Sequence, residues 1–278
     1  MCRSIITSLI TILVIVVSVG YVFLEIKKSQ YNEELKKLST KTLIFSQNYF
    51  VNSYLHPISN SKYILIDTLS TGKEINILGE MASKGIKTFE LLFILITHYH
   101  NDHAGNAKVM VDASKAKIGV PKLEAKYISK GIPTPRTTSF QPIFKKIMDS
   151  VPQNITNPEV NVDFEFSGGE ILKEFDNIKI ITTPGHTNGS ISLITESGDC
   201  FIGDLLSAAP FTVNYPMLHW FRVYEDYTKV KGSIEKLLNE KSCKLYFPGH
   251  GMPFTRESLS NWMKENSNSI ETIILKNE

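Results

Sequence analysis

The chain has 278 residues and a formal net charge of +2, from 30 Lys and Arg against 28 Asp and Glu. With 42% hydrophobic and 21% charged residues its composition is that of a globular protein, which excludes a disordered chain, a collagen-like chain and a polytopic membrane protein. The charge balance provides no general basic surface, so we expect no nucleic-acid partner. We expect a small-molecule substrate, while the composition leaves the oligomeric state open.

The amino terminus contains one long apolar run. Residues 5–24 include no charged side chain, and a helix of about 20 residues matches a hydrocarbon core of about 30 Å. We therefore predict that residues 1–26 form a single-pass transmembrane anchor in the cell membrane. The alternative is a signal peptide cleaved after Gly20, which would leave a secreted protein. The basic residues that flank the run do not decide the side of the membrane on which the rest of the chain lies.

The remainder is predicted to be a polar stalk over residues 27–41 and one domain over residues 42–278. In the stalk, Glu33 precedes Lys37 by four residues, which is a helical spacing. Apolar and turn patterns predict the elements of the domain in chain order. They are strands at 49–55, 62–67 and 91–97 with helices at 74–83 and 104–113, a proline-rich lid at 121–161 with a helix at 144–149, strands at 160–166, 178–183, 190–195, 200–203 and 244–247, and a helix at 224–239.

Histidines gather directly after the apolar strand at 91–97. His98, His100, Asp102 and His103 lie within six residues, where a strand is expected to lead into a helix. Such a cluster is costly to bury without polar partners, and neutral imidazoles are good ligands for zinc or iron. His98 and His100 can point to one side and Asp102 and His103 to a neighbouring side, so this geometry favours two metal ions.

Three further candidates each follow an apolar strand and adjoin a glycine. They are His186 in Pro-Gly-His, Asp204 in Gly-Asp, and His250 in Pro-Gly-His-Gly. Ligands at strand ends can converge on one edge of a sheet sandwich, and the glycines allow tight turns.

The ordered set HxHxDH, PGH, GD and PGHG, over residues 42–255, resembles the metallo-β-lactamase superfamily. The resemblance implies an α/β fold, a four-layer αββα sandwich with a binuclear metal site on one edge. It assigns His98, His100 and His186 to the first metal, Asp102, His103 and His250 to the second, and Asp204 to a bridge between them. The expected cofactor is two Zn²⁺, with iron or manganese as alternatives.

Other residues receive weaker assignments. Asp67, at the end of a strand, is expected to orient a ligand or to be a plain turn residue. His219, Phe211 and Tyr215 are candidates for the substrate pocket, although a structural role is an alternative for each. His56 is expected in a surface turn. The three cysteines are too scattered for a disulfide framework, and Cys200 and Cys243 are expected to be inert core residues.

The resemblance also implies a mechanism in which a metal-bridging hydroxide attacks a carbonyl, with Asp102 orienting the nucleophile or moving its proton. Zinc β-lactamases of the superfamily usually have Cys or Ser at the position of Asp204, so the chain is more similar to the glyoxalase II-like branch. We therefore expect a thioester, ester or lactone hydrolase. The alternatives are an iron-dependent persulfide dioxygenase, a β-lactamase or phosphodiesterase, and a non-catalytic membrane-tethered partner.

Overall fold

The computed structural model describes residues 29, 33–48, 50–135, 146, 150, 156–208, 214–219 and 223–277. The chain divides into two compact units, residues 1–40 and 41–278. In the first unit residues 33–37 are helical, and ion pairs join Lys36 to Glu33 at 2.7 Å and Lys37 to Glu34 at 2.5 Å. The run at 5–24 lies outside the described residues, and within them no helix is long and apolar enough to cross a membrane.

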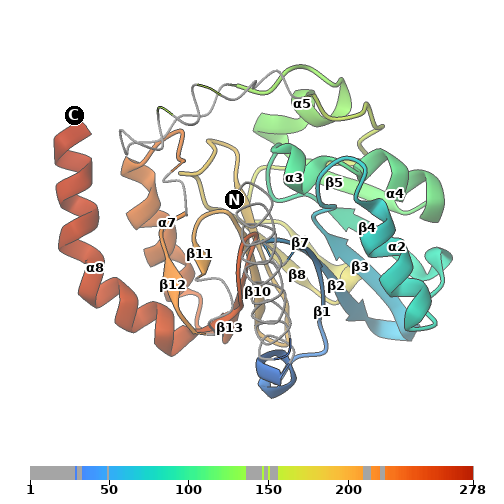
Figure 1. Ribbon diagram of the computed structural model, residues 1–278, viewed down its shortest axis with the longest axis horizontal. Helices are drawn as coiled ribbons and strands as arrows, with labels where there is room; N and C mark the ends of the chain where they lie inside the picture. Colours follow the sequence, from blue (N-terminus) through green and yellow to red (C-terminus); the bar gives the residue numbers. More distant parts are fainter. Residues whose placement is uncertain are drawn as a thin grey trace, which may run out of the picture. The chain divides into compact units, whose positions relative to one another are not determined.

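The second unit contains two six-stranded sheets (Figure 1). The first sheet has the order β1 (Leu43–Gln47), β2 (Val51–Ile58), β3 (Lys62–Ile66), β4 (Leu91–Leu95), β5 (Lys117–Pro121), β6 (Phe164–Phe166). The second has the order β14 (Phe254–Thr255), β13 (Leu245–Pro248), β10 (Asp199–Gly203), β9 (Ile191–Ile194), β8 (Ile178–Thr182), β7 (Ile171–Leu172). In the first sheet β1, β2 and β3 pair antiparallel, and β3, β4, β5 and β6 pair in parallel. In the second sheet β10 and β13 pair in parallel, and the other neighbours pair antiparallel.

Shorter elements complete the domain. A two-stranded ribbon joins β11 (Ser207–Ala208) to β12 (Pro216–Met217). The helices are α2 (Glu74–Ser83), α3 (Asn101–Ala104), α4 (Ala107–Ser114), α5 (Ala125–Ser129), α7 (Thr228–Asn239) and α8 (Arg256–Asn277). Single 3₁₀ turns are η1 (Ser59–Ser61), η2 (Thr88–Glu90), η3 (Lys122–Glu124) and η4 (Lys173–Phe175).

The alternation of side chains along the strands produces four layers. On one side of the first sheet, Leu65 of β3 belongs to a core that includes Ile77 of α2. Between the two sheets, Tyr54 of β2 packs against Phe201 of β10, with ring centroids 5.4 Å apart. On the outer side of the second sheet, Ile202 shares a core with residues of α7 and α8, among them Ile234 and Leu259. Figure 1 shows α2 and α4 flanking the sandwich on one side and α7 and α8 on the other. The predicted αββα arrangement is therefore confirmed.

Several predicted elements differ in extent. The helix at 104–113 is two helices, because α3 begins at Asn101 and α4 follows after Gly105. The helix at 224–239 begins only at Thr228, and the strand at 160–166 is reduced to β6. The start of the predicted lid belongs to β5, η3 and α5, whereas most of its predicted helix at 144–149 lies outside the described residues.

The expectation for His56 was wrong. Strand β2 continues through Pro57 to Ile58, so that His56 lies within the sheet and is 8% exposed. Its Nδ1 is 2.8 Å from Thr42 Oγ1, which donates a hydrogen bond to Asp199 Oδ2 at 2.7 Å. Burial is the main cause that lowers the pKa of His56, although Asp199 acts in the opposite direction.

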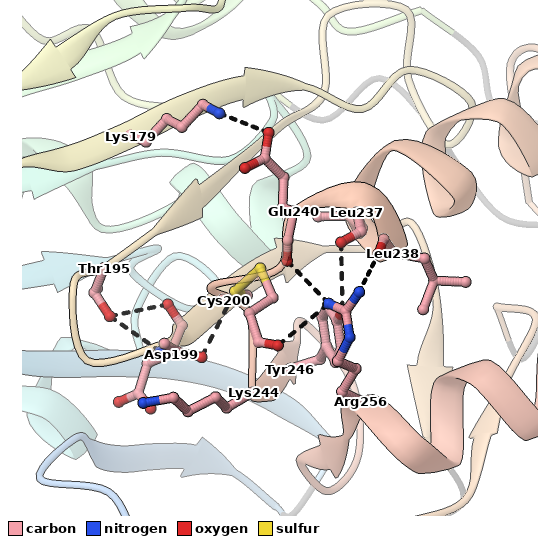
Figure 2. The surroundings of a disulfide bond; sticks show 12 residues. Lys179, Thr195, Asp199, Cys200, Leu237, Leu238, Glu240, Lys244, Tyr246 and Arg256 are labelled. Atoms are coloured by element: carbon pink, nitrogen blue, oxygen red, sulfur yellow. Dashed lines mark hydrogen bonds and ion pairs between the residues drawn. A yellow bond between two sulfur atoms is a disulfide. The ribbon is translucent and has the colours of Figure 1, made fainter.

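Cys200 and Cys243 are core residues, as expected, but they form a disulfide that the sequence analysis did not predict (Figure 2). Both residues are completely buried in the core under α7 and α8. The bond joins β10 to the turn that precedes β13, and Arg256 caps this turn through hydrogen bonds to the carbonyl oxygens of Glu240 at 2.9 Å and Cys243 at 3.4 Å. The covalent link thus joins β10, which leads to Asp204, to the turn before β13, which leads to His250.

Candidate metal centre

The candidate ligands lie where strands of the two sheets end. In the first sheet, β4 leads to the loop of His98 and His100. In the second, β8 leads to His186, β10 to Asp204 and β13 to His250. The fold therefore brings together the candidate ligands that the sequence analysis placed at strand ends.

Asp204 lies at the middle of this group. Its Oδ2 is 3.1 Å from His250 Nε2, 3.3 Å from His186 Nε2 and 3.9 Å from His98 Nε2. Its Oδ1 is 3.3 Å from His103 Nε2. One carboxylate thus faces imidazoles from both sheets, which is the position needed for a ligand shared by two cations.

The donor atoms form two triplets with Asp204 between them. His98, His100 and His186 each offer one atom within 4.8 Å of the others, and Asp102, His103 and His250 do the same. The His100 Nδ1 and His186 Nε2 atoms are 2.9 Å apart. All seven predicted ligands therefore lie in one cluster, in which the donor atoms of His98, His103 and Asp204 form a further close group.

Asp67 holds His103 in place. Its Oδ2 accepts a hydrogen bond from His103 Nδ1 at 2.8 Å, so the Nε2 atom is left to face Asp204. The same carboxylate accepts hydrogen bonds from the backbone N–H and the hydroxyl of Thr97, each at 2.8 Å. Asp67 contacts a predicted ligand, as expected of an orienting residue, and has the left-handed backbone that Asp tolerates (φ 59°).

Backbone carbonyls orient two other imidazoles. His186 Nδ1 donates to Val223 O at 2.8 Å, and His250 Nδ1 donates to Phe50 O at 2.9 Å. A carbonyl accepts only from a protonated nitrogen, so whenever either ring is neutral its lone pair is on the Nε2 atom that faces the cluster. Metal-binding histidines are held in this way, with the second ring nitrogen donating to an oxygen.

The electrostatics divide the imidazoles into two sets. Burial lowers the pKa of His98 and His186 well below the ordinary value and that of His100 to about 4. Burial would also lower the pKa of His250, but the Asp204 and Asp102 carboxylates raise it to about 10. The triplet of His98, His100 and His186 is consequently neutral, the form that coordinates a cation.

The glycine that precedes His250 makes room for this arrangement. Gly249 N donates to Gly203 O at 2.7 Å, which keeps the ends of β13 and β10 side by side. A Cβ atom at position 249 would overlap Asp204 Oδ1 and the His103 ring. The carboxylate therefore occupies the space that a side chain at position 249 would need.

The residues fit metal ions. The Nε2 atoms of His98, His100 and His103 and the Oδ1 atom of Asp204 are buried and make no hydrogen bond within the described part of the chain. A buried polar atom without a partner costs about 1–3 kcal/mol, and a coordinated cation removes that cost. The donor set of imidazoles and carboxylates is one that zinc binds.

The predicted pocket residues have different outcomes. His219 is buried, and its Nε2 is 3.3 Å from Asp204 Oδ2, so it forms a further metal-capable triplet with His186 and Asp204. Tyr215 is 60% exposed and lines a cavity of about 570 Å³ between residues 214–218 and α8, whose lining includes none of the seven ligands. Phe211 lies outside the described residues.

Sequence reasoning missed two glutamates next to the cluster. Glu225 Oε1 accepts a hydrogen bond from the Tyr99 hydroxyl at 2.5 Å, and its Oε2 accepts one from Asn188 N at 2.7 Å. Glu124 is buried beside the same two loops. Neither residue belongs to a motif, and each has hydrogen-bond partners that are distant in the sequence.

Comparison with known proteins agrees with this geometry. The model of the metallo-beta-lactamase superfamily matches residues 47–250, which contain all seven ligand candidates. The chain belongs to this superfamily. It is 29% identical over 206 residues to "Probable metallo-hydrolase MJ0888" of Methanocaldococcus jannaschii, covering 73% of this chain and 88% of that protein. It is 25% identical over 252 residues to "Probable metallo-hydrolase YflN" of Bacillus subtilis, covering 87% and 94%.

Solved structures share the superfamily fold. A metallo-beta-lactamase of Cronobacter sakazakii superimposes with a TM-score of 0.62 at 16% identity, covering 84% of this chain and 92% of that one. The metallo-beta-lactamase family protein TTHA1429 of Thermus thermophilus gives 0.59 at 20% identity, covering 83% and 81%. The α/β fold is thus that of the superfamily, and its metallo-hydrolase members indicate a metal-dependent hydrolase.

Proposed function

We propose that this metallo-β-lactamase superfamily member is a binuclear zinc hydrolase that cleaves an ester, thioester or lactone carbonyl of a small molecule. The observation that carries the proposal is the position of Asp204, within 3.1–3.9 Å of imidazoles from both triplets. Zinc sites take about four ligands. Seven donors that share one central carboxylate therefore favour two ions over one.

Each residue has a defined part in this proposal. His98, His100 and His186 would hold one ion, Asp102, His103 and His250 the other, and Asp204 both. Two bound zinc ions supply Lewis acidity and a water molecule with a pKa near 7.

Asp102 and His219 would act on the substrate side of the cluster. The Asp102 side chain is 34% exposed, whereas that of Asp204 is 2% exposed, so Asp102 can orient the attacking water and take up its proton. His219, with its Nε2 near Asp204, can donate a hydrogen bond to a substrate oxygen.

The identity of residue 204 supports a carbonyl substrate outside the β-lactam class. A carboxylate there provides negative charge between two cations, and the resemblance associates it with the glyoxalase II-like branch. A thioester is therefore the first substrate class to test.

We also propose that residues 5–24 anchor the protein in the cell membrane and that the domain lies on its oxidising, exported side. The uncharged 20-residue run supports the anchor. The buried Cys200–Cys243 disulfide supports the side, because disulfides are rare in reducing compartments. Membrane fractionation tests the anchor. In a Cys2→Ser background, the attachment of a membrane-impermeant thiol reagent to an introduced exposed cysteine, such as Glu159→Cys, tests the side of the membrane. Labelling only after the cells are lysed would place the domain inside.

The function is tested with the detergent-solubilised full chain loaded with zinc. The assay compares S-lactoylglutathione, an aliphatic lactone, a β-lactam and a phosphodiester. We expect hydrolysis of the thioester or the lactone and two zinc ions per chain by elemental analysis. Inactivity on both carbonyl substrates with zinc bound would contradict the proposal, and one iron per chain in the protein as isolated would favour redox chemistry.

A further inference from the structure

Glu124 is a buried carboxylic acid with no part in the proposed chemistry. It ends η3, directly after β5, and is 2% exposed. Acidic side chains are almost never this buried unless they are paired. The partners of Glu124 are hydrogen-bond donors. The role of this buried residue therefore depends on which parts of the chain those donors belong to.

The donors come from the two loops that carry the first triplet. Glu124 Oε2 accepts from Tyr99 N at 2.5 Å, and Tyr99 lies between His98 and His100. Glu124 Oε1 accepts from Gly189 N at 3.0 Å and from the hydroxyl of Thr187, which directly follows His186. One carboxylate therefore joins a loop of the first sheet to a loop of the second.

The hydrogen bonds of Glu124 lie next to the ligands of the first triplet. A backbone hydrogen bond from Ile191 N to Thr97 O at 3.1 Å links the residue before His98 to the start of β9, which follows the loop of His186. Beyond Thr97 the chain turns, and Glu124 holds the backbone of Tyr99 relative to the loop of His186, whereas Glu225 links that loop to the Tyr99 hydroxyl. On the ligand side of this link, the His98 and His186 rings are 4.8 Å apart.

The local packing is built around this carboxylate. A Cβ atom at Gly189 would come within 2.6 Å of Glu124 Oε1, so the glycine allows the loop to approach it. On the other side of Tyr99, its carbonyl oxygen accepts a hydrogen bond from Asn157 Nδ2 at 2.7 Å. Both peptide groups of Tyr99 are therefore fixed, one by Glu124 and one by Asn157.

We propose that Glu124 is a positioning residue that ties the loop of His98 and His100 to the loop of His186 and thereby assembles the three-histidine metal set before a cation binds. This inference rests on the proposed metal-dependent function. It assigns Glu124 no contact with substrate or with the reacting atoms.

The test compares Glu124→Gln with the wild type in the full chain. Glutamine has the same shape, but its amide nitrogen accepts no hydrogen bond, whereas both oxygens of the carboxyl group can accept one in either protonation state. The amide must therefore face either Tyr99 N–H or Gly189 N–H, donor against donor. Zinc affinity is measured by competition with a chromophoric chelator. Cobalt(II) absorption spectra report the geometry of each equivalent bound. We expect one of the two equivalents to bind about 10- to 100-fold more weakly, with a changed cobalt spectrum, and the other to be unaffected.

Two controls separate positioning from loss of stability. Ile77→Val lowers stability in the α2 core, away from the ligand loops, and should leave both affinities and both spectra unchanged. Glu159→Gln removes an exposed carboxylate and should do the same. Wild-type affinity and spectrum in Glu124→Gln would overturn the proposal.

A second variant serves if Glu124→Gln does not fold. Thr187→Val removes one donor to Glu124 and should weaken the same equivalent about fivefold, the value of one hydrogen bond. In a folded Glu124→Gln background the same change should add little, because the two residues act through one contact. Unchanged zinc affinity in Thr187→Val would contradict the proposal. Absence of hydrolysis by the zinc-loaded wild type refutes the proposed function but leaves this result standing.

Discussion

His103 presents its Nε2 atom to Asp204 because its Nδ1 atom donates to Asp67 at 2.8 Å. The ring is completely buried, so neither nitrogen can turn to water. The direction in which this imidazole points is therefore decided by a carboxylate that belongs to none of the four ligand motifs.

Asp67→Asn tests this relationship. Asparagine tolerates the left-handed backbone at this position but loses the charge and one acceptor. We expect zinc affinity or kcat/KM to fall about 10- to 100-fold. Asp112→Asn, an exposed change on α4, is the matched control. Equal zinc affinity and kcat/KM in wild type and Asp67→Asn would show that His103 does not need this partner.

Asp204→Ala tests the shared carboxylate. The substitution removes the carboxylate that lies within 3.1–3.9 Å of imidazoles from both triplets, and two cations would then lack this shared negative charge. We expect fewer than two zinc ions per chain by elemental analysis and a loss of kcat/KM of at least about a hundredfold. Two tightly bound zinc ions in Asp204→Ala would contradict the bridging role.

His219→Gln separates a substrate contact from a metal ligand. If His219 donates to a substrate oxygen, kcat/KM falls about a hundredfold while both zinc ions stay bound. Reduced zinc affinity would instead make His219 a ligand. Tyr215→Ala, in the cavity beside α8, is expected to leave kcat/KM unchanged.

Removal of the disulfide should destabilise the domain. For cysteines 43 residues apart, the loop-entropy model gives about 4 kcal/mol for the loss of the cross-link. The double variant Cys200→Ser/Cys243→Ser should therefore unfold at lower urea concentration, and a reducing agent should shift the wild type in the same direction. Cys2→Ser is the control. Equal urea midpoints for wild type and double variant would show that the disulfide adds no stability.

The pH dependence of stability should report Glu124. Burial raises the pKa of its carboxyl from 4.5 to about 8, so between these values the folded chain holds a proton that the unfolded chain has lost. The contribution of protonated Glu124 to the free energy of unfolding is complete below pH 4.5. It is lost as the pH rises through 8, by up to about 1.4 kcal/mol per pH unit. Glutamine does not titrate. The free energy of unfolding of the wild type minus that of Glu124→Gln, measured in urea with a chelator present, should thus decrease from pH 5 to pH 8. A constant or increasing difference would contradict the raised pKa.

The ligand cluster could be predicted because a local sequence pattern accompanies each ligand. His98, His186, Asp204 and His250 all follow apolar strands, and three of them adjoin a glycine. The same local signals predicted α2 within its observed bounds and β4, β8, β9 and β10 within one or two residues.

The features that sequence reasoning missed depend on contacts between distant segments. Glu225 meets Tyr99 across 126 residues, and no pattern near either residue indicates this. The disulfide was missed because Cys200 and Cys243 adjoin separate strands whose parallel pairing is known only from the fold. The long α8 escaped prediction because, over residues 256–268, its exposed side chains are polar and only a narrow face, with Leu259 and Met263, enters the core.

Gly249 has a consequence for how this site tolerates change. Its backbone is not in the left-handed region, so an alanine could adopt the same chain conformation. What alanine lacks is room, because its methyl group would occupy the volume of the Asp204 carboxylate and the His103 ring. Even a methyl group at position 249 would therefore displace the Asp204 carboxylate or the His103 ring from its position. In a mutational scan, residue 249 should be as intolerant as the ligands themselves, although it donates no atom to a metal.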